Sequence, residues 1–270
     1  MATVIRKDAV QEKETLQVVA GGGWLGGFGN LLRKELGQWF STRMWWVQTL
    51  IWVVILNGVS TIVMLTEGAP PPELLQEAVQ TFLPMAVGAV ALGTVIAAQG
   101  AVVGEKELGT AAWVMSKPAS RYAFILAKIV AYAVGFWVTA LMIPAILFVI
   151  ITGQLVAAPL ALSPFLLGLA VAALNQLFYL ILTLMLGTLY SSRGPVAGIS
   201  IAFVMSGLLL KGMIPMPILM VTPWLLGDLA GALALGMPLP PNWFVPIGAT
   251  AIWIVLFAVV ALWRFNREEF

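Results

Sequence analysis

Six apolar runs, free of Asp, Glu, Lys and Arg except for Lys211 at the end of the fifth, take up about half of this chain of 270 residues. A helix needs about 20 consecutive apolar residues to cross the hydrocarbon core of a bilayer. Only 10% of the residues are charged, against roughly 25% in an average soluble domain. Too few charges remain to cover a soluble protein of this size, so the pattern predicts an all-α polytopic membrane protein. The six predicted transmembrane helices cover about residues 45–66, 81–103, 129–152, 164–189, 195–211 and 243–263.

Residues 212–242 are also apolar, but prolines interrupt them repeatedly. Proline breaks a helix because it lacks the backbone N–H and its ring clashes with the preceding turn. Irregular backbone at membrane depth is tolerated only where protein or water covers it. We therefore expect two short re-entrant helices in or on the outer leaflet, between the fifth and sixth spans.

The N-terminal region divides into two parts. Residues 1–30 are charged up to Glu14 and then rich in glycine, which predicts a flexible cytoplasmic tail. Residues 31–44 predict an amphipathic helix in the membrane interface, with Trp39 at headgroup depth; a plain charged leader to the first span is the alternative. Its apolar stripe is Leu32, Leu36, Trp39, Phe40 and Met44.

The basic residues indicate the orientation of the chain. All 14 Lys and Arg residues except Lys211 fall in the two ends of the chain and in the second and fourth loops. The first loop, residues 67–80, carries glutamates and no basic residue. Basic residues concentrate on the cytoplasmic side of membrane proteins, so we expect both termini to be cytoplasmic, which requires an even number of spans.

Several kinds of chemistry are excluded by the residues that are missing. The chain has no cysteine and no histidine, which removes thiolate nucleophiles, disulfides, the commonest general base and the commonest metal ligand. No glycine is followed by lysine, so there is no Walker A loop. We expect no catalytic, cofactor-binding or metal-binding residue in this chain, and no nucleic-acid partner.

The predicted span cores also lack carboxylates, which ion-driven carriers usually bury as their coupling groups. The polar residues that stand out in these spans are amides, which either form hydrogen bonds between helices or mark a polar point on a substrate path. Energy for transport would then come from another protein. The polar candidates for a pathway are Asn57, Gln99, Asn175 and Gln176.

The second loop, Gly104–Lys128, has the densest group of charges between spans. Two glutamates near its start suit the N-terminus of a short helix. Exposed apolar residues in the same helix, Trp113 to Met115, have no core to enter, so we expect the helix to dock into a groove on a partner protein; a helix lying on lipid headgroups is the alternative. The apolar face consists of Leu108, Ala111, Ala112, Trp113 and Met115.

The sequence also predicts where the charged residues of this loop lie and which residues end its helix. The pairs Glu105/Glu107 and Glu268/Glu269 should be solvated at the surface, whereas general acid–base catalysis needs a desolvated carboxyl group. Gly109 and Thr110 allow a turn, and Pro118 stops the helix. Arg121 and Lys128 should anchor the third span at the headgroups.

The run Gly104–Thr110, followed by Ser116-Lys117-Pro118, Arg121 and Lys128, resembles the "GE-x-E-x-GT" signature of ABC-2 type permeases. These proteins are the transmembrane subunits of ATP-binding cassette transporters, mostly exporters. The opening segment Arg33-Lys34-Glu35-Leu36 is also similar to theirs. Where the family has two leucines before the serine, this chain has Val114 and Met115 after Trp113, which keeps a bulky apolar contact.

The resemblance implies a six-span ABC-2 type domain over residues 45–270, in a bacterial or archaeal cytoplasmic membrane. It makes 31–44 a connecting helix, 104–121 a coupling loop and 212–242 an external re-entrant segment. Two copies of an ATPase subunit, which bind ATP and Mg, and a second permease subunit would be the protein partners. The implied coupling residues are Glu105, Glu107, Gly109, Thr110, Trp113, Met115, Pro118 and Arg121. The implied residues of the interfacial helix are Arg33, Lys34, Glu35 and Trp39.

The function that the resemblance implies is ATP-driven export of a hydrophobic or amphipathic substrate, with no hydrolytic activity in this chain itself. Two alternatives remain open: an ion-coupled secondary transporter or channel, and a membrane anchor that recruits a cytoplasmic complex. An intramembrane enzyme acting on lipids is disfavoured, because it would need an embedded acid, base, metal or nucleophile.

Overall fold

The computed structural model describes residues 23–269. Most of the predicted tail, residues 1–22, lies outside this range. The tail was predicted to extend to residue 30, which is wrong for residues 28–30 because they already belong to the first helix. The residues just before them pack on the second loop, where the backbone N–H of Ser120 donates to the carbonyl oxygen of Gly26 at 2.8 Å.

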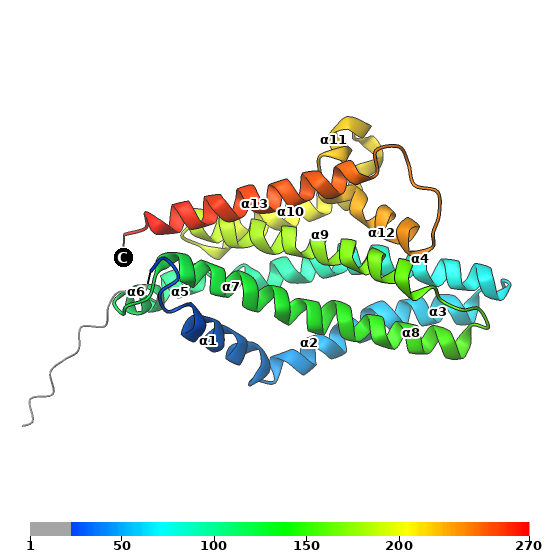
Figure 1. Cartoon of the computed structure of the whole chain (residues 1–270), viewed down its shortest axis with the longest axis horizontal. Helices are drawn as coiled ribbons and strands as arrows, with labels where there is room; N and C mark the ends of the chain where they lie inside the picture. Colours follow the sequence, from blue (N-terminus) through cyan, green and yellow to red (C-terminus); the bar gives the residue numbers. More distant parts are fainter. Residues whose placement is uncertain (1–22, 270) are drawn as a thin grey trace, which may run out of the picture.

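The described residues form helices and no strand, so the predicted all-α class is confirmed. Figure 1 shows an elongated bundle, with α5, α6 and the C-terminus together at one end. We call this the α5–α6 end.

The elements are α1 (Phe28–Phe40), α2 (Met44–Trp52), the π-helix η1 (Val53–Asn57), α3 (Gly58–Thr66), α4 (Pro71–Ala98), α5 (Val103–Glu107), α6 (Thr110–Met115), α7 (Arg121–Phe136), the π-helix η2 (Trp137–Met142), α8 (Ile143–Leu155), α9 (Leu162–Leu189), α10 (Arg193–Leu209), the 3₁₀ turn η3 (Lys211–Met213), α11 (Met216–Met220), the 3₁₀ turn η4 (Pro223–Leu225), α12 (Leu226–Ala234) and α13 (Phe244–Asn266).

Five helical stretches in the described range are long and apolar enough to cross a membrane. They are Met44–Thr66, Pro71–Glu107, Arg121–Leu155, Leu162–Leu189 and Phe244–Asn266. The remaining predicted span corresponds to α10, which is apolar but has only 17 residues. At a rise of 1.5 Å per residue, α10 is about 25 Å long, somewhat less than the hydrocarbon core of a typical bilayer.

Two helices begin well before the apolar runs predicted as spans, and local capping explains both. The helix of the second predicted span begins at Pro71 rather than near Thr81, because proline suits the first helical position and Glu73 the first turn. The helix of the third begins at Arg121 rather than near Ile129. There the side chain of Ser120 accepts a hydrogen bond from the backbone N–H of Ala123 at 2.9 Å, which caps the helix.

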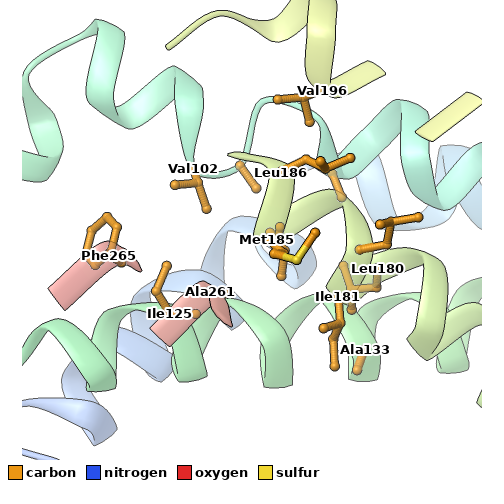
Figure 2. Close-up of a cluster of buried hydrophobic side chains, with 14 of the residues drawn as sticks. Val102, Ile125, Ala133, Leu180, Ile181, Met185, Leu186, Val196, Ala261 and Phe265 are labelled. Atoms are coloured by element: carbon orange, nitrogen blue, oxygen red, sulfur yellow. The ribbon is translucent and has the colours of Figure 1, made fainter. Parts of the chain in front are cut away.

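The core of the bundle is built around α9. Its half from Phe178 to Thr188 is buried on every side, as expected of a helix that is apolar all round. Figure 2 shows this cluster, in which Met185 and Leu186 of α9 lie among side chains from α7, α10 and α13 and from the turn before α5. Nearer the start of α9, a side chain at Gly168 would place its Cβ 2.5 Å from the carbonyl oxygen of Ala230, so only glycine permits this approach to α12.

Residues 212–242 form several short helical pieces, of which α11 and α12 are α-helical. Two indole groups fasten this segment to the long helices. The Trp224 indole nitrogen donates to the carbonyl oxygen of Phe203 in α10 at 3.2 Å. The Trp253 indole nitrogen in α13 donates to the carbonyl oxygen of Val221 at 2.9 Å.

Candidate functional site

Four side chains of alternating charge form the centre of the candidate site, at the α5–α6 end. Lys128 of α7, whose side chain is only 2% exposed, places its Nζ 3.0 Å from Glu35 Oε1 and 2.8 Å from Glu105 Oε1. Lys34 Nζ lies 3.2 Å and 3.0 Å from the same two oxygens. We call Lys34, Glu35, Glu105 and Lys128 the charge cluster. Its formal charges cancel, so each buried charge has a partner of opposite sign.

The charge cluster corrects three expectations. Glu105 is not a solvated surface carboxylate, because it is largely buried against two lysines. Lys128 does not reach the headgroups but lies inside the protein. Glu35 is buried on α1 rather than exposed on an interfacial helix, and the ammonium group of Lys128 compensates its desolvation.

The environment of Lys34 favours its charged form. Burial alone lowers the pKa of this lysine, but hydrogen bonds to Glu105 and Glu35 and the negative charges of both carboxylates outweigh burial. The pKa of Lys34 therefore lies above its ordinary value. The side chain remains a cation at neutral pH and continues to bridge α1 and α5.

The other two charged residues of α5 reach two further helices. Lys106 Nζ lies 2.8 Å from an oxygen of Glu268, just beyond the end of α13. Glu107 Oε2 lies 3.3 Å from Nε of Arg193, the first residue of α10. Together with the charge cluster, these pairs join the five residues of α5 to α1, α7, α10 and the end of α13.

Arg121 strengthens the same junction from α7. Its Nη1 donates to the carbonyl oxygens of Asn266 at 2.6 Å and Glu268 at 2.7 Å. This contact corrects the expectation of a headgroup anchor, because the guanidinium group instead binds the backbone at the end of α13. Beside it, the rings of Phe124 and Phe265 stack with centroids 4.9 Å apart.

Trp39 is a further correction. It is 8% exposed and lies inside the protein, with ring centroids 5.4 Å from Tyr132 and 5.0 Å from Phe136. A Cβ at Gly135 would come within 2.5 Å of this indole, so the glycine opens the space that the ring fills. The buried face of α1 is therefore Leu31, Glu35 and Trp39, while Arg33 points outward.

The turn between α5 and α6 carries the most exposed apolar side chains of the site. Gly109 has φ +69°, a conformation that glycine adopts without strain, and the Thr110 hydroxyl donates to the carbonyl oxygen of Glu105 at 3.1 Å. Leu108 is 75% and Trp113 63% exposed, and we call these two side chains the tip. Lys117 Nζ lies 4.0 Å above the Trp113 ring.

The neighbours of the tip are less exposed than the sequence suggested. Val114, which was expected to be exposed, is buried in the main core cluster, and Met115 packs against that cluster. The helix ends at Met115, before Pro118 is reached. The tip is thus a small apolar projection, and the residues next to it, Val114 and Met115, pack into the core of the bundle.

The predicted polar pathway residues do not gather in one place. Asn57 Nδ2 donates to the carbonyl oxygen of Pro144 at 3.2 Å, and Asn175 Nδ2 donates to that of Val87 at 2.9 Å. These are the expected hydrogen bonds between helices. The Gln99 side chain bonds locally to the carbonyl oxygen of Ile96. The Gln176 side chain is buried, and neither of its amide atoms has a hydrogen bond.

The pairing of charges was the main feature that sequence reasoning missed. A signal exists for Glu35, which interrupts the otherwise apolar spacing of Leu31 and Trp39 on one helix face. Its partner Lys128 lies 93 residues away, and nothing local indicates the contact. Within residues 23–269, no group of three or more acidic side chains is placed to hold a metal ion.

Comparison with known proteins gives one result for this chain. A family model described as "Protein of unknown function (DUF2705)" matches residues 45–270. No curated protein matches the sequence. The matched range includes α5, α6 and Lys128 but not α1, so two members of the charge cluster lie outside it.

Proposed function

The chain belongs to the DUF2705 family, and we propose that it is the transmembrane permease subunit of an ABC-2 type ATP-binding cassette transporter. The observation that carries this proposal is the construction of the α5–α6 end. The exposed apolar tip lies just after α5, with Leu108 in the turn and Trp113 in α6, and α5 is joined by ion pairs to α1, α7, α10 and the end of α13. A displacement applied to the tip would therefore reach four parts of the bundle together.

The partner in this proposal is an ATPase subunit, with one copy under each of two permease subunits. A groove on the ATPase would accept Trp113 and Leu108, since buried aromatic side chains supply most of the binding energy at protein interfaces. ATP and Mg would bind only to the ATPase, and closure of its two copies on ATP would push on the tip. Reversing a population from 1:99 to 99:1 takes about 5.5 kcal/mol of differential binding.

The proposed topology has six spans, including the 17-residue α10, with both termini and the α5–α6 end in the cytoplasm. The distribution of Lys and Arg supports this orientation. Residues 212–242 would then lie at the outer leaflet as the re-entrant segment. The exposed apolar side chains of α2, α3 and α13 suit contact with lipids and with a second permease subunit, identical or paralogous.

Cysteine labelling tests this topology directly, because the chain contains no cysteine of its own. Gly153, Gly194 and Gly212 have open space around a new Cβ, so single cysteines there should not disturb the fold. A membrane-impermeant maleimide should label Gly153→Cys and Gly212→Cys on intact cells, and Gly194→Cys only after permeabilisation. Equal labelling of Gly194→Cys and Gly212→Cys from outside would show that α10 does not cross the membrane.

The energy source separates the proposal from the ion-coupled and anchor alternatives. Proteoliposomes that contain the permease and its ATPase should accumulate a fluorescent amphiphile only when ATP and Mg are supplied on the ATPase side. Dissipating the proton gradient with an uncoupler should leave this transport unchanged, because no carboxylate is buried in the predicted span cores. Transport that survives ATP depletion and stops with the uncoupler would contradict the proposal, and a complete lack of transport would favour an anchor.

A further inference from the structure

A cavity of about 250 Å³ lies away from the α5–α6 end, between α4, α9, α10 and α12. Its walls are mostly apolar and small, with Val87 and Gly88 from α4, Val204 and Gly207 from α10, and Gly227 from α12. Figure 1 labels α4, α9, α10 and α12, the helices that enclose this cavity. Ligand sites are commonly concave and apolar, with a few polar groups that fix orientation, and this cavity has both elements.

The first polar element lies where α9 lines the cavity. Asn175 lines the cavity and is buried. Its amide nitrogen donates a hydrogen bond to the carbonyl oxygen of Val87. The side-chain carbonyl oxygen is left to accept a hydrogen bond from a ligand. Tyr179 lies one helical turn further along α9 and lines the same space.

The second polar element is an ion pair. Lys211 and Asp228 both line the cavity, and Lys211 Nζ is paired with Asp228 Oδ2. The two side chains are 34% and 61% exposed, so both can be reached from outside. The ammonium group retains two further donors and the carboxylate retains free lone pairs, so each can bind a second group of opposite charge.

The paired charges decide which headgroup the cavity favours. A net anion would be attracted by Lys211 but repelled by Asp228, and a net cation would meet the reverse. A zwitterion can satisfy both at once, with its ammonium group on Asp228 and its phosphate on Lys211. The volume lies just below the usual range for small-molecule pockets, roughly 300–1,000 Å³, which suits one alkyl chain rather than two.

We propose that this cavity binds a zwitterionic amphiphile with a single alkyl chain. The chain would lie among the small apolar side chains, and the headgroup would lie on Lys211 and Asp228. Binding at this site does not depend on coupling to an ATPase, whereas identifying the bound molecule as transported cargo rests on the proposed function.

Native mass spectrometry of the full chain in dodecyl maltoside tests the binding without an ATPase or ATP. Lysophosphatidylethanolamine is the zwitterionic probe and lysophosphatidylglycerol the anionic one. We expect one saturable molecule of the first, with at least tenfold weaker binding of the second. Equal binding of the two probes would overturn the proposal, whatever transport experiments show.

Two substitutions locate the site. Gly227→Leu fills the cavity from α12, where a Cβ makes only ordinary contacts with Pro84 and Val87, and should reduce binding at least tenfold. Gly198→Leu adds the same side chain on an exposed part of α10 with open space around it and should bind normally. Unchanged binding by Gly227→Leu, or equal loss in both variants, would overturn the assignment.

A third variant tests headgroup recognition even if Gly227→Leu fails to fold. Asp228→Asn leaves Lys211 as an uncompensated cation at the cavity, and the substituted side chain is mostly exposed, so folding should be preserved. The preference should then reverse, with lysophosphatidylglycerol bound more tightly than lysophosphatidylethanolamine. An unchanged order of affinity would show that the ion pair does not select the headgroup.

Discussion

Replacing Lys128 with methionine is expected to destabilise the folded protein by about 3–5 kcal/mol, the usual cost of removing one partner from a buried ion pair. Methionine keeps a long flexible side chain but removes the only buried cation between Glu35 and Glu105. The partly exposed Lys34 would remain as the sole neighbour of both carboxylates. Unfolding of the purified protein in detergent, followed by temperature or denaturant, measures the loss.

Two further variants show whether the loss arises from unpaired charge. Lys117→Met removes an exposed lysine beside an indole and should cost no more than about 1 kcal/mol. Adding Glu35→Gln to Lys128→Met should recover part of the stability, because one buried charge is removed with its partner. If Lys128→Met unfolds like the unsubstituted protein, the charge cluster does not stabilise this end of the bundle.

Replacing Trp113 with alanine is expected to weaken binding of the proposed ATPase subunit by about 2–4 kcal/mol, the range for a central aromatic residue of an interface. That loss corresponds to roughly 30- to 1,000-fold in the dissociation constant. The indole is 63% exposed in the isolated chain, so its removal should leave the stability of the permease almost unchanged. Titration of the purified protein with the proposed ATPase measures the effect, and loss of co-purification is the simpler readout.

Trp263 supplies a matched control for this experiment. It is also an exposed tryptophan with a cation above its ring, since the Arg267 guanidinium lies 4.3 Å from the ring centroid. It belongs to α13 and not to the tip. Trp263→Ala should therefore bind the ATPase normally, and an equal loss of binding in both variants would contradict the assignment of the tip as the docking element.

The sequence was sufficient to predict the elements whose pattern is local. Long uncharged runs predicted the apolar helices, and the glutamates, Gly109 and Trp113 predicted a short exposed helical turn in the second loop. The helix starts at Pro71 and Arg121 were missed because capping and the first polar turns extend a helix beyond its apolar run. Apolar content marks the part of a helix that crosses lipid, and not the whole helix.

The contacts that define the site were not predictable because they join distant segments. Trp39 looked like an interfacial residue by type, but it enters the protein where Gly135 leaves room for it. Glu35 and Lys128 each looked like a surface charge, and each is buried only because the other is present. Pairwise compensation of this kind depends on tertiary packing, which a single sequence does not display.

The separation of 93 residues between Glu35 and Lys128 also constrains how the protein is made. At a synthesis rate of about 5–20 residues per second, the glutamate leaves the ribosome roughly 5–20 s before its partner lysine. Throughout that interval the Lys128 ammonium group that compensates the Glu35 carboxylate does not yet exist, so α1 cannot bury this carboxylate in its final place. Glu268 pairs with Lys106 only after nearly the whole chain has been translated. The α5–α6 end, which contains contacts of the first helix, is therefore completed only after Glu268 has been synthesised.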